Sequence, residues 1–171
     1  MTLELPFSFT LSAPVATTAG PIGEITITRL PQLREFLQSG LPVAPDGSFD
    51  MAALVRLLAD CSSAPEFVFS RMDGSDLFNL ALQFRAALAP QGPSPFPLRR
   101  PTGADLIAAG SPLTALGEWA PRSVLALACA LSGQDAEAIG ALPGPDFLAI
   151  VNEIAGFLGR RPATSSGFTS T

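Results

Sequence analysis

Apolar and polar residues alternate in two short stretches near the start of the chain. Over residues 7–11, Phe and Leu alternate with Ser and Thr, and over residues 25–28, Ile alternates with Thr. A period of two residues is typical of a half-buried strand. The segment between the stretches contains Pro14, Gly20 and Pro21, which favour a loop. We therefore predict an antiparallel β-ribbon within residues 1–30, and its apolar face must dock on the rest of the protein because a lone ribbon is marginal in water.

Beyond residue 30 the apolar spacing becomes helical. Pro31 begins a short helix that stops before Gly40, and Asp50 caps a longer one. A turn around residues 66–69 leads to a strongly amphipathic helix over residues 75–88. One face of that helix should enter the core, and it carries Leu77, Leu80, Phe84 and Leu88.

The helix over residues 75–88 also carries apolar side chains away from that core face. Phe78 and Leu82 lie four residues apart and about 100° around the helix from the core stripe. An exposed Phe–Leu pair typically marks a partner site. We predict that Phe78 and Leu82 belong to a protein-binding groove. The alternative is that the ribbon or the other helical unit covers them.

The chain resembles itself at an offset of about 70 residues. Pro31 then falls on Pro101 and Gly40 on Gly110, and the apolar register of the helices follows. Chance register between two amphipathic segments is the alternative. The predicted class is α+β, mostly α, with an N-terminal antiparallel β-ribbon and two similar small helical units related by a rough two-fold axis. Its divisions are the ribbon at 1–30, a first helical unit at 31–88, a Pro-rich linker at 89–100, a second unit at 101–159 and a polar tail at 160–171.

The composition argues against catalysis. The sequence has no His, no Tyr and no Lys, since all ten of its cationic residues are Arg. Imidazole bases, His metal ligands, Schiff bases and phosphate-loop lysines are thereby excluded. Asp73, Asp76 and Asp146 could pair for acid–base chemistry, but first-turn positions explain them better. We predict no catalytic, cofactor-binding or metal-binding residues and no enzyme activity.

Charge and cysteine usage narrow the partners. The net charge of −5 disfavours nucleic acid, and the pairs Arg99–Arg100 and Arg160–Arg161 are typical of solvated ends beside prolines. Cys61 and Cys129 lie far apart and are expected to be buried, reduced thiols. The longest apolar run, near residues 124–131, is too short to span a bilayer, and no basic region precedes the first apolar stretch as a secretory signal requires.

Several of these segments resemble the tail assembly chaperones of long-tailed bacteriophages, of the phage Mu and phage P2 type. The matching residues in the first half are Ile25–Pro31. Those in the second half are Leu98–Leu106, Leu127–Gly133, and Leu142–Phe147 through Gly156–Leu158. Coverage is best over residues 7–40 and 98–158. The chain departs from the family in length, because residues 41–97 form an extra stretch that is either a duplicated unit or an insertion.

The resemblance implies a function without catalysis. Such a chaperone binds the long, helix-rich tape measure protein in the host cytoplasm and keeps it soluble until tail tube subunits polymerise around it. The expected partners are thus the tape measure protein, the tail tube protein and further copies of this chain, with no nucleic acid and no membrane. The alternative is a structural protein retained in the virion tail or neck.

Overall fold

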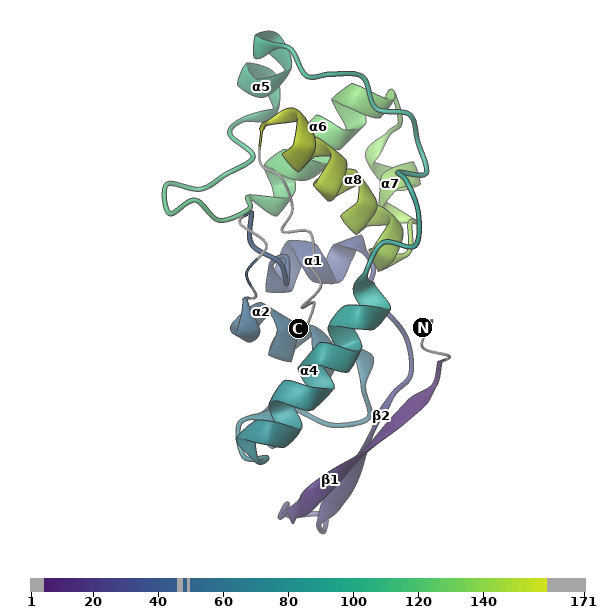
Figure 1. Cartoon of the computed structure of the whole chain (residues 1–171), viewed down its shortest axis with the longest axis vertical. Coiled ribbons are helices and arrows are strands. Elements are labelled where there is room, and N and C mark those ends of the chain that lie inside the picture. Colours follow the sequence, from purple (N-terminus) through teal and green to yellow (C-terminus); the bar gives the residue numbers. More distant parts are fainter. Residues whose placement is uncertain (1–4, 46–47, 49, 160–171) are drawn as a thin grey trace, which may run out of the picture.

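The computed structural model describes residues 5–45, 48 and 50–159. Two strands are followed by eight helices (Figure 1), which confirms the predicted α+β, mostly helical class. The strands are β1 Phe7–Val15 and β2 Ile22–Ile27. The helices are α1 Leu33–Ser39, α2 Met51–Cys61, α3 Glu66–Phe69, α4 Gly74–Leu88, α5 Gly103–Ala109, α6 Pro121–Ser132, α7 Ala136–Gly140 and α8 Gly144–Phe157. Residues 89–102, which include the predicted Pro-rich linker, form no helix or strand.

The β-ribbon forms and docks as its alternating pattern predicts. The two strands pair antiparallel, with Phe9 opposite Ile25, and the inward-facing Leu11 is buried. The Thr28 N–H donates to the carbonyl of Cys61 at 2.9 Å, which attaches the end of β2 to the end of α2. These contacts give the ribbon the apolar and polar partners that an isolated ribbon lacks.

The helix ends follow the capping residues of the sequence. The Asp50 carboxylate accepts a hydrogen bond from the Ala53 N–H at 2.9 Å and caps α2. The predicted start of the short helix α1 at Pro31 is two residues too early, because Gln32 is the N-cap residue and the helix begins at Leu33. The Gln32 N–H donates a hydrogen bond to the Glu35 carboxylate at 2.7 Å, as in a capping box. Helix α1 ends at Gly40, whose φ of 90° suits glycine best.

Each helix of the first unit has a counterpart 70 residues later. Adding 70 to the first residues of α1, α2, α3 and α4 gives the first residues of α5, α6, α7 and α8, and the last residues agree within one position. Polar contacts repeat at the same offset. Arg29 pairs with Glu35 and reaches the carbonyl of Asp60, as Arg99 pairs with Asp105 and reaches that of Ala130. We therefore treat residues 31–88 and 101–158 as the first and second units.

The two units are joined through α1, which lies between them (Figure 1). Phe36 on α1 stacks on Phe147 of α8, and Gln32 forms an isolated antiparallel bridge with Pro143. A two-fold arrangement would make this contact reciprocal and place α5 against the first unit. Figure 1 instead shows α5 at the far end of the molecule, so the predicted two-fold relationship is wrong and the units are joined head to tail.

One continuous core runs through both units and the ribbon. Leu80, Phe84 and Leu88 of α4 are buried, as the sequence predicts, whereas Leu77 is only half-buried. Cys61 is a buried free thiol, as expected, and burial raises the pKa of its thiol to about 12. The expectation that Cys129 is buried is wrong in part. This free thiol is half-buried, because the core-facing residues of α6 are its neighbours Leu127, Ala128 and Leu131.

Candidate protein-binding site

The outer face of α4 exposes the predicted apolar pair. Phe78 is 56% exposed and Leu82 is 41% exposed. They face outward because the buried residues of this helix, among them Leu80 and Phe84, hold its opposite side in the core. The ribbon and the second unit therefore leave both side chains accessible, unlike the alternative in which one of them covers the pair.

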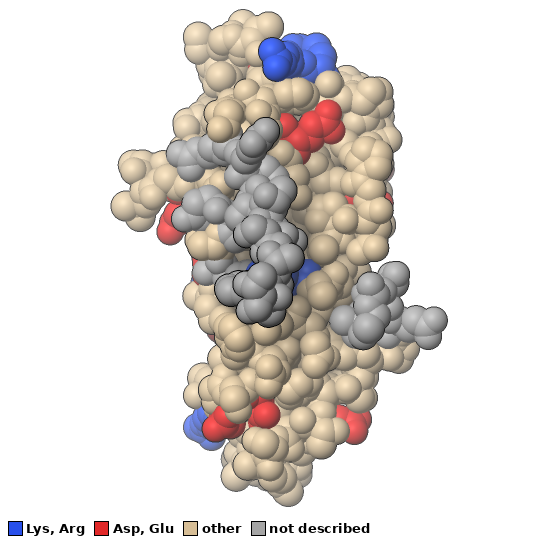
Figure 2. All heavy atoms as spheres, viewed as in Figure 1, with Lys and Arg blue, Asp and Glu red and all other residues tan. Residues whose placement is uncertain are grey.

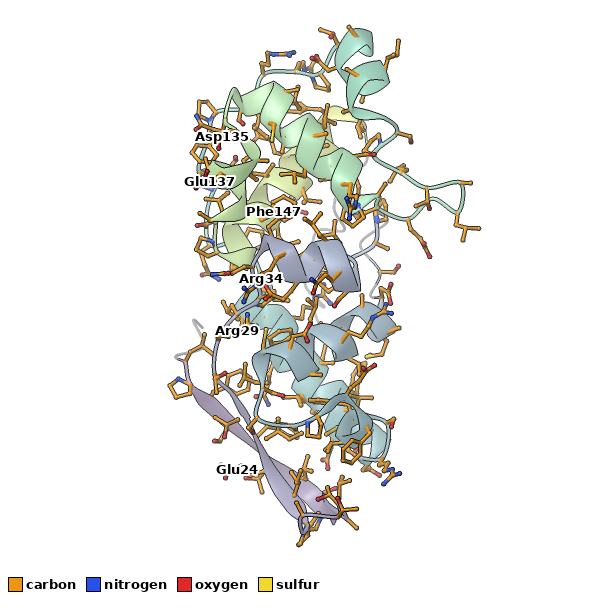
Figure 3. The ribbon with its side chains drawn as sticks, turned by 180° about the vertical axis from the view of Figure 1, so that it is seen from behind. Glu24, Arg29, Arg34, Asp135, Glu137 and Phe147 are labelled. Atoms are coloured by element: carbon orange, nitrogen blue, oxygen red, sulfur yellow. The ribbon has the colours of Figure 1, made fainter. Side chains whose placement is uncertain are left out.

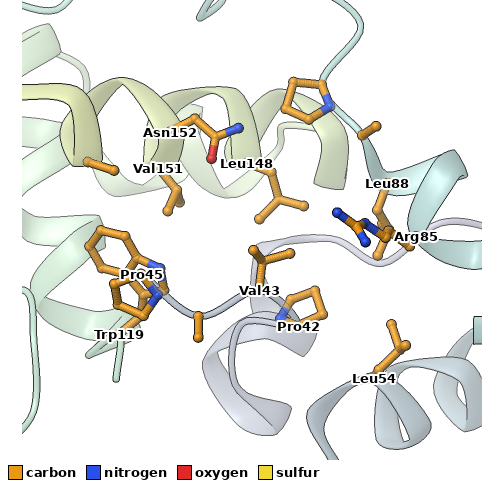
Figure 4. Close-up of a pocket in the computed structure, with 14 residues that line it drawn as sticks. Pro42, Val43, Pro45, Leu54, Arg85, Leu88, Trp119, Leu148, Val151 and Asn152 are labelled. Atoms are coloured by element: carbon orange, nitrogen blue, oxygen red, sulfur yellow. The ribbon is translucent and has the colours of Figure 1, made fainter. Parts of the chain in front are cut away.

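A small apolar groove lies between the two units (Figure 4). Its cavity is about 190 Å³. One wall is the loop at residues 42–45, and the other is α8 with Leu148, Val151 and Asn152, which point toward that loop. Trp119 lies at one end and the last turn of α4 at the other. The lining is mostly aliphatic and aromatic, as is typical of sites that accept an apolar side chain or helix.

The exposed pair on α4 leads into this groove. Arg85 and Ala89 line the groove and lie seven and eleven residues after Phe78, which is the spacing of one helix face. The stripe formed by Phe78, Leu82, Arg85 and Ala89 together with the groove is here called the binding track. Its helical spacing and its apolar lining fit an amphipathic helix laid along it.

Few charges interrupt the surface that contains the binding track. On the part of this face that Figure 2 leaves visible, most of the surface is neutral, and charged residues appear toward both ends and at a few places between them.

The acidic residues singled out by the sequence occupy helix ends. Asp73 caps α4, where hydrogen bonds from the Ser75 side chain and N–H lower the pKa of its carboxyl. Asp76 accepts two hydrogen bonds from Ser12 at 2.8 Å and so links α4 to β1, while Asp146 lies in the first turn of α8. Within the described ranges, no cluster of three or more His, Cys, Asp or Glu residues could hold a metal ion.

Each of the two units has an arginine–carboxylate pair at its first helix. Arg99 forms two hydrogen bonds to Asp105, at 2.6 and 2.7 Å, and these lower the pKa of the Asp105 carboxyl. In the first unit, Glu35 of α1 pairs with Arg34 of the same helix and with Arg29, which precedes it (Figure 3). These arginines anchor helix ends and leave no basic patch. The pair Arg160–Arg161 lies outside the described residues.

A second apolar surface lies on the first unit, away from the residues that the sequence pattern indicates as a binding site. There α2, α3 and the start of α4 line an open groove that includes Met51, Val55 and Leu77. Phe67 is 43% exposed at its edge, where the Arg71 guanidinium lies 5.3 Å from its ring centroid. Phe67 could have indicated this surface in the sequence. The one-turn helix α3 buries Val68 and Phe69, and the preceding aromatic residue is left on its other side.

In the described residues, no helix is long and apolar enough to cross a membrane. The sequence matches no protein-family model, no curated protein and no solved structure at a significant level.

Proposed function

We propose that this protein is a bacteriophage tail assembly chaperone that binds a helical segment of the tape measure protein in the host cytoplasm and has no catalytic role. The observation that carries the proposal is the binding track, in which Phe78 and Leu82 are solvent-exposed and lead into the groove between the units. A long helix without its tube would expose apolar side chains to water, and a shallow apolar track can shield them. An acidic net charge of −5 keeps such a complex soluble.

Chemistry and resemblance support the same proposal. The residues of one segment that resembles the phage family, Leu142–Phe147, include the start of α8 and lie beside the contact between the units. They therefore maintain the junction that forms the groove. In the part of the chain that the structure describes, every buried polar side-chain atom has a hydrogen-bond partner.

The experiment is co-expression with a bacteriophage tape measure protein, followed by affinity co-purification. The double variant Phe78→Ser with Leu82→Ser should keep the melting temperature of the wild type, because both side chains are exposed. It should fail to retain the tape measure protein in the soluble fraction. The matched control is Asn79→Ser with Gln83→Ser, which changes two exposed polar residues of the same helix and should retain binding. A double variant that unfolds, or that still binds, contradicts the proposal.

The second candidate is a structural protein of the virion tail or neck. The same apolar surfaces would then be permanently covered by other tail subunits, as obligate interfaces are. Mass spectrometry of purified particles separates the two. A chaperone is absent from the mature particle, whereas a structural subunit is present at a fixed copy number.

A further inference from the structure

The contact between the units has a docking side and a receiving side. The docking side is the start of the first unit, where Leu33 and Phe36 project from α1. The receiving side is the start of α8 with the end of α7. There Phe147 stacks on Phe36, and the Cδ2 atom of Leu33 would lie 3.9 Å from a Cβ atom on Gly140. Gly144 allows the closest approach, since a Cβ atom on it would lie 2.5 Å from the carbonyl oxygen of Pro31.

Each side of this contact has a counterpart in the other unit, 70 residues later for the docking side and 70 residues earlier for the receiving side. Within one molecule these two counterparts do not contact each other. The counterpart of the docking side is the start of the second unit, with Pro101, Gly103 and Leu106, at the top of Figure 1. The counterpart of the receiving side includes Ser70, Gly74 and Leu77, beside the open groove at the opposite end. We call these surfaces the docking end and the receiving end.

Exposure marks both ends as unpartnered. Ile107, on the helix of the docking end, is 85% exposed, whereas its counterpart Leu37 is half-buried. Leu77 at the receiving end is half-buried, whereas its counterpart Phe147 is fully buried. A Cβ atom added to Gly74 would meet nothing within 4 Å, whereas the same atom on its counterpart Gly144 would meet backbone at 2.5 Å. The receiving end thus keeps the same glycine at the start of its helix, and no described residue packs on it.

The surroundings of the contact also recur. On α8, Leu148 lines the groove between the units opposite Pro42 and Val43. Its counterpart on α4 is the exposed Phe78. The counterparts of the loop residues line an open apolar groove beside α5, which consists of Leu106, Ile107, Ser111, Pro112, Leu113 and Leu158. A docked second copy would therefore bring Phe78 to this groove and cover apolar surface on both chains.

We propose that copies of this chain associate head to tail, with the docking end of one copy seated on the receiving end of the next. Such a contact is heterologous, because the two surfaces differ, and it extends into a chain of copies in which the 70-residue unit repeats along the array. The side chains that meet are smaller than those inside one molecule, since Gly103 replaces Leu33 and Leu106 replaces Phe36. The association is accordingly weaker than the internal contact and depends on protein concentration. This inference goes beyond the proposed function and does not depend on it. Both use Phe78, so a docked copy and a helix bound on the binding track exclude each other at that residue.

The first experiment is sedimentation velocity of the purified full chain over a concentration series, with no other protein present. The mean mass of the wild type should rise with concentration. Gly74→Ala should abolish this rise at unchanged melting temperature, because the new Cβ atom meets the Pro101 carbonyl only when a second copy docks. The control Gly92→Ala also adds a Cβ atom that meets no described atom within 4 Å, in the segment between the units, and should associate as the wild type does.

The second experiment tests whether the contact is heterologous. Ile107→Asp places a charge at the docking end, on a side chain so exposed that the fold should be retained. This variant and Gly74→Ala should each be monomeric, but an equimolar mixture should form dimers and nothing larger, since each supplies the end that the other has kept. A wild type that stays monomeric up to the highest concentration, association that survives either variant, or a mixture that stays monomeric would overturn the proposal.

Discussion

Phe36 and Phe147 stack across the junction of the two helical units, with ring centroids 5.9 Å apart and ring planes inclined by 24°. Both side chains are fully buried. Stacked aromatic pairs contribute about 0.5–1.5 kcal/mol beyond the area that they bury. This pair fixes how the units sit against each other and so shapes the groove between them.

Truncation of either ring should destabilise the whole protein. We expect Phe36→Ala and Phe147→Ala each to lower the free energy of unfolding by about 3–5 kcal/mol, because each leaves a cavity in the core. The double variant should lose less than the sum, since the two residues share one contact. Urea unfolding measures all three. Phe78→Ala is the control, and its exposed side chain should cost well under about 1 kcal/mol. A Phe147→Ala variant as stable as this control would contradict the role of the stack.

Gly144→Ala should destabilise the protein although alanine favours helices. The added Cβ atom would lie 2.5 Å from the Pro31 carbonyl oxygen, and a backbone atom cannot rotate away from it. We expect a loss of about 1–3 kcal/mol, as for other overpacked sites, visible as a lower melting temperature. Gly156→Ala, on the same helix with nothing nearby, should be neutral or raise stability by up to about 1 kcal/mol. Equal melting temperatures for the two variants would show that the junction is looser than described.

Glu35 should make stability depend on pH in the acid range. Burial alone would raise the pKa of this carboxyl, but hydrogen bonds from Arg34 and the Gln32 N–H, with the charge of Arg29, lower it below its ordinary value. The stabilisation is therefore complete above the ordinary carboxyl pKa of about 4 and is lost as the pH falls through the lower folded value. We expect about 1 kcal/mol, because Arg29 and Arg34 are 40% and 70% exposed and water screens both pairs.

The test is Glu35→Gln in urea unfolding between pH 7 and pH 2. The variant should be less stable than the wild type at pH 7, and the two curves should converge at the acid end. Glu137→Gln, on the exposed surface of α7, is the control and should leave the pH dependence unchanged. A constant difference between Glu35→Gln and the wild type at every pH would contradict the assignment.

The two thiols should react at very different rates. Burial raises the pKa of the Cys61 thiol to about 12, so that almost no thiolate is present at neutral pH and none is accessible. Cys129 is half-buried, and burial followed by the charge of Asp135 raises the pKa of its thiol as well. A thiol reagent should therefore label Cys129 slowly in the native protein and Cys61 only on unfolding. The variant Cys129→Ser should remain unlabelled until denaturant is added, and rapid native labelling of that variant would refute the burial of Cys61.

Local chemistry in the sequence was sufficient for the elements and their ends. Alternation with Thr and Ser predicted the ribbon, Asp50 predicted the start of α2, and Gly40 predicted the end of α1. The position of Phe78 and Leu82 off the core face of α4 was also predictable, because the phase of an amphipathic helix defines which side enters the core. These features depend on residues a few positions apart, where spacing alone fixes the geometry. Only the structure shows that neither the ribbon nor the second unit covers Phe78 and Leu82.

The arrangement of the two helical units relative to each other was decided only by the tertiary structure. The 70-residue register was visible in the sequence, but it fits a two-fold pair and a head-to-tail array equally well. The choice depends on contacts between distant residues, such as the Pro31 carbonyl against Gly144 and Phe36 against Phe147. Spacing along the chain does not show which of two equivalent surfaces is covered. The start of α8, which α1 covers, and its open counterpart at the start of α4 have similar residues. Packing breaks that equivalence and leaves one docking end and one receiving end free.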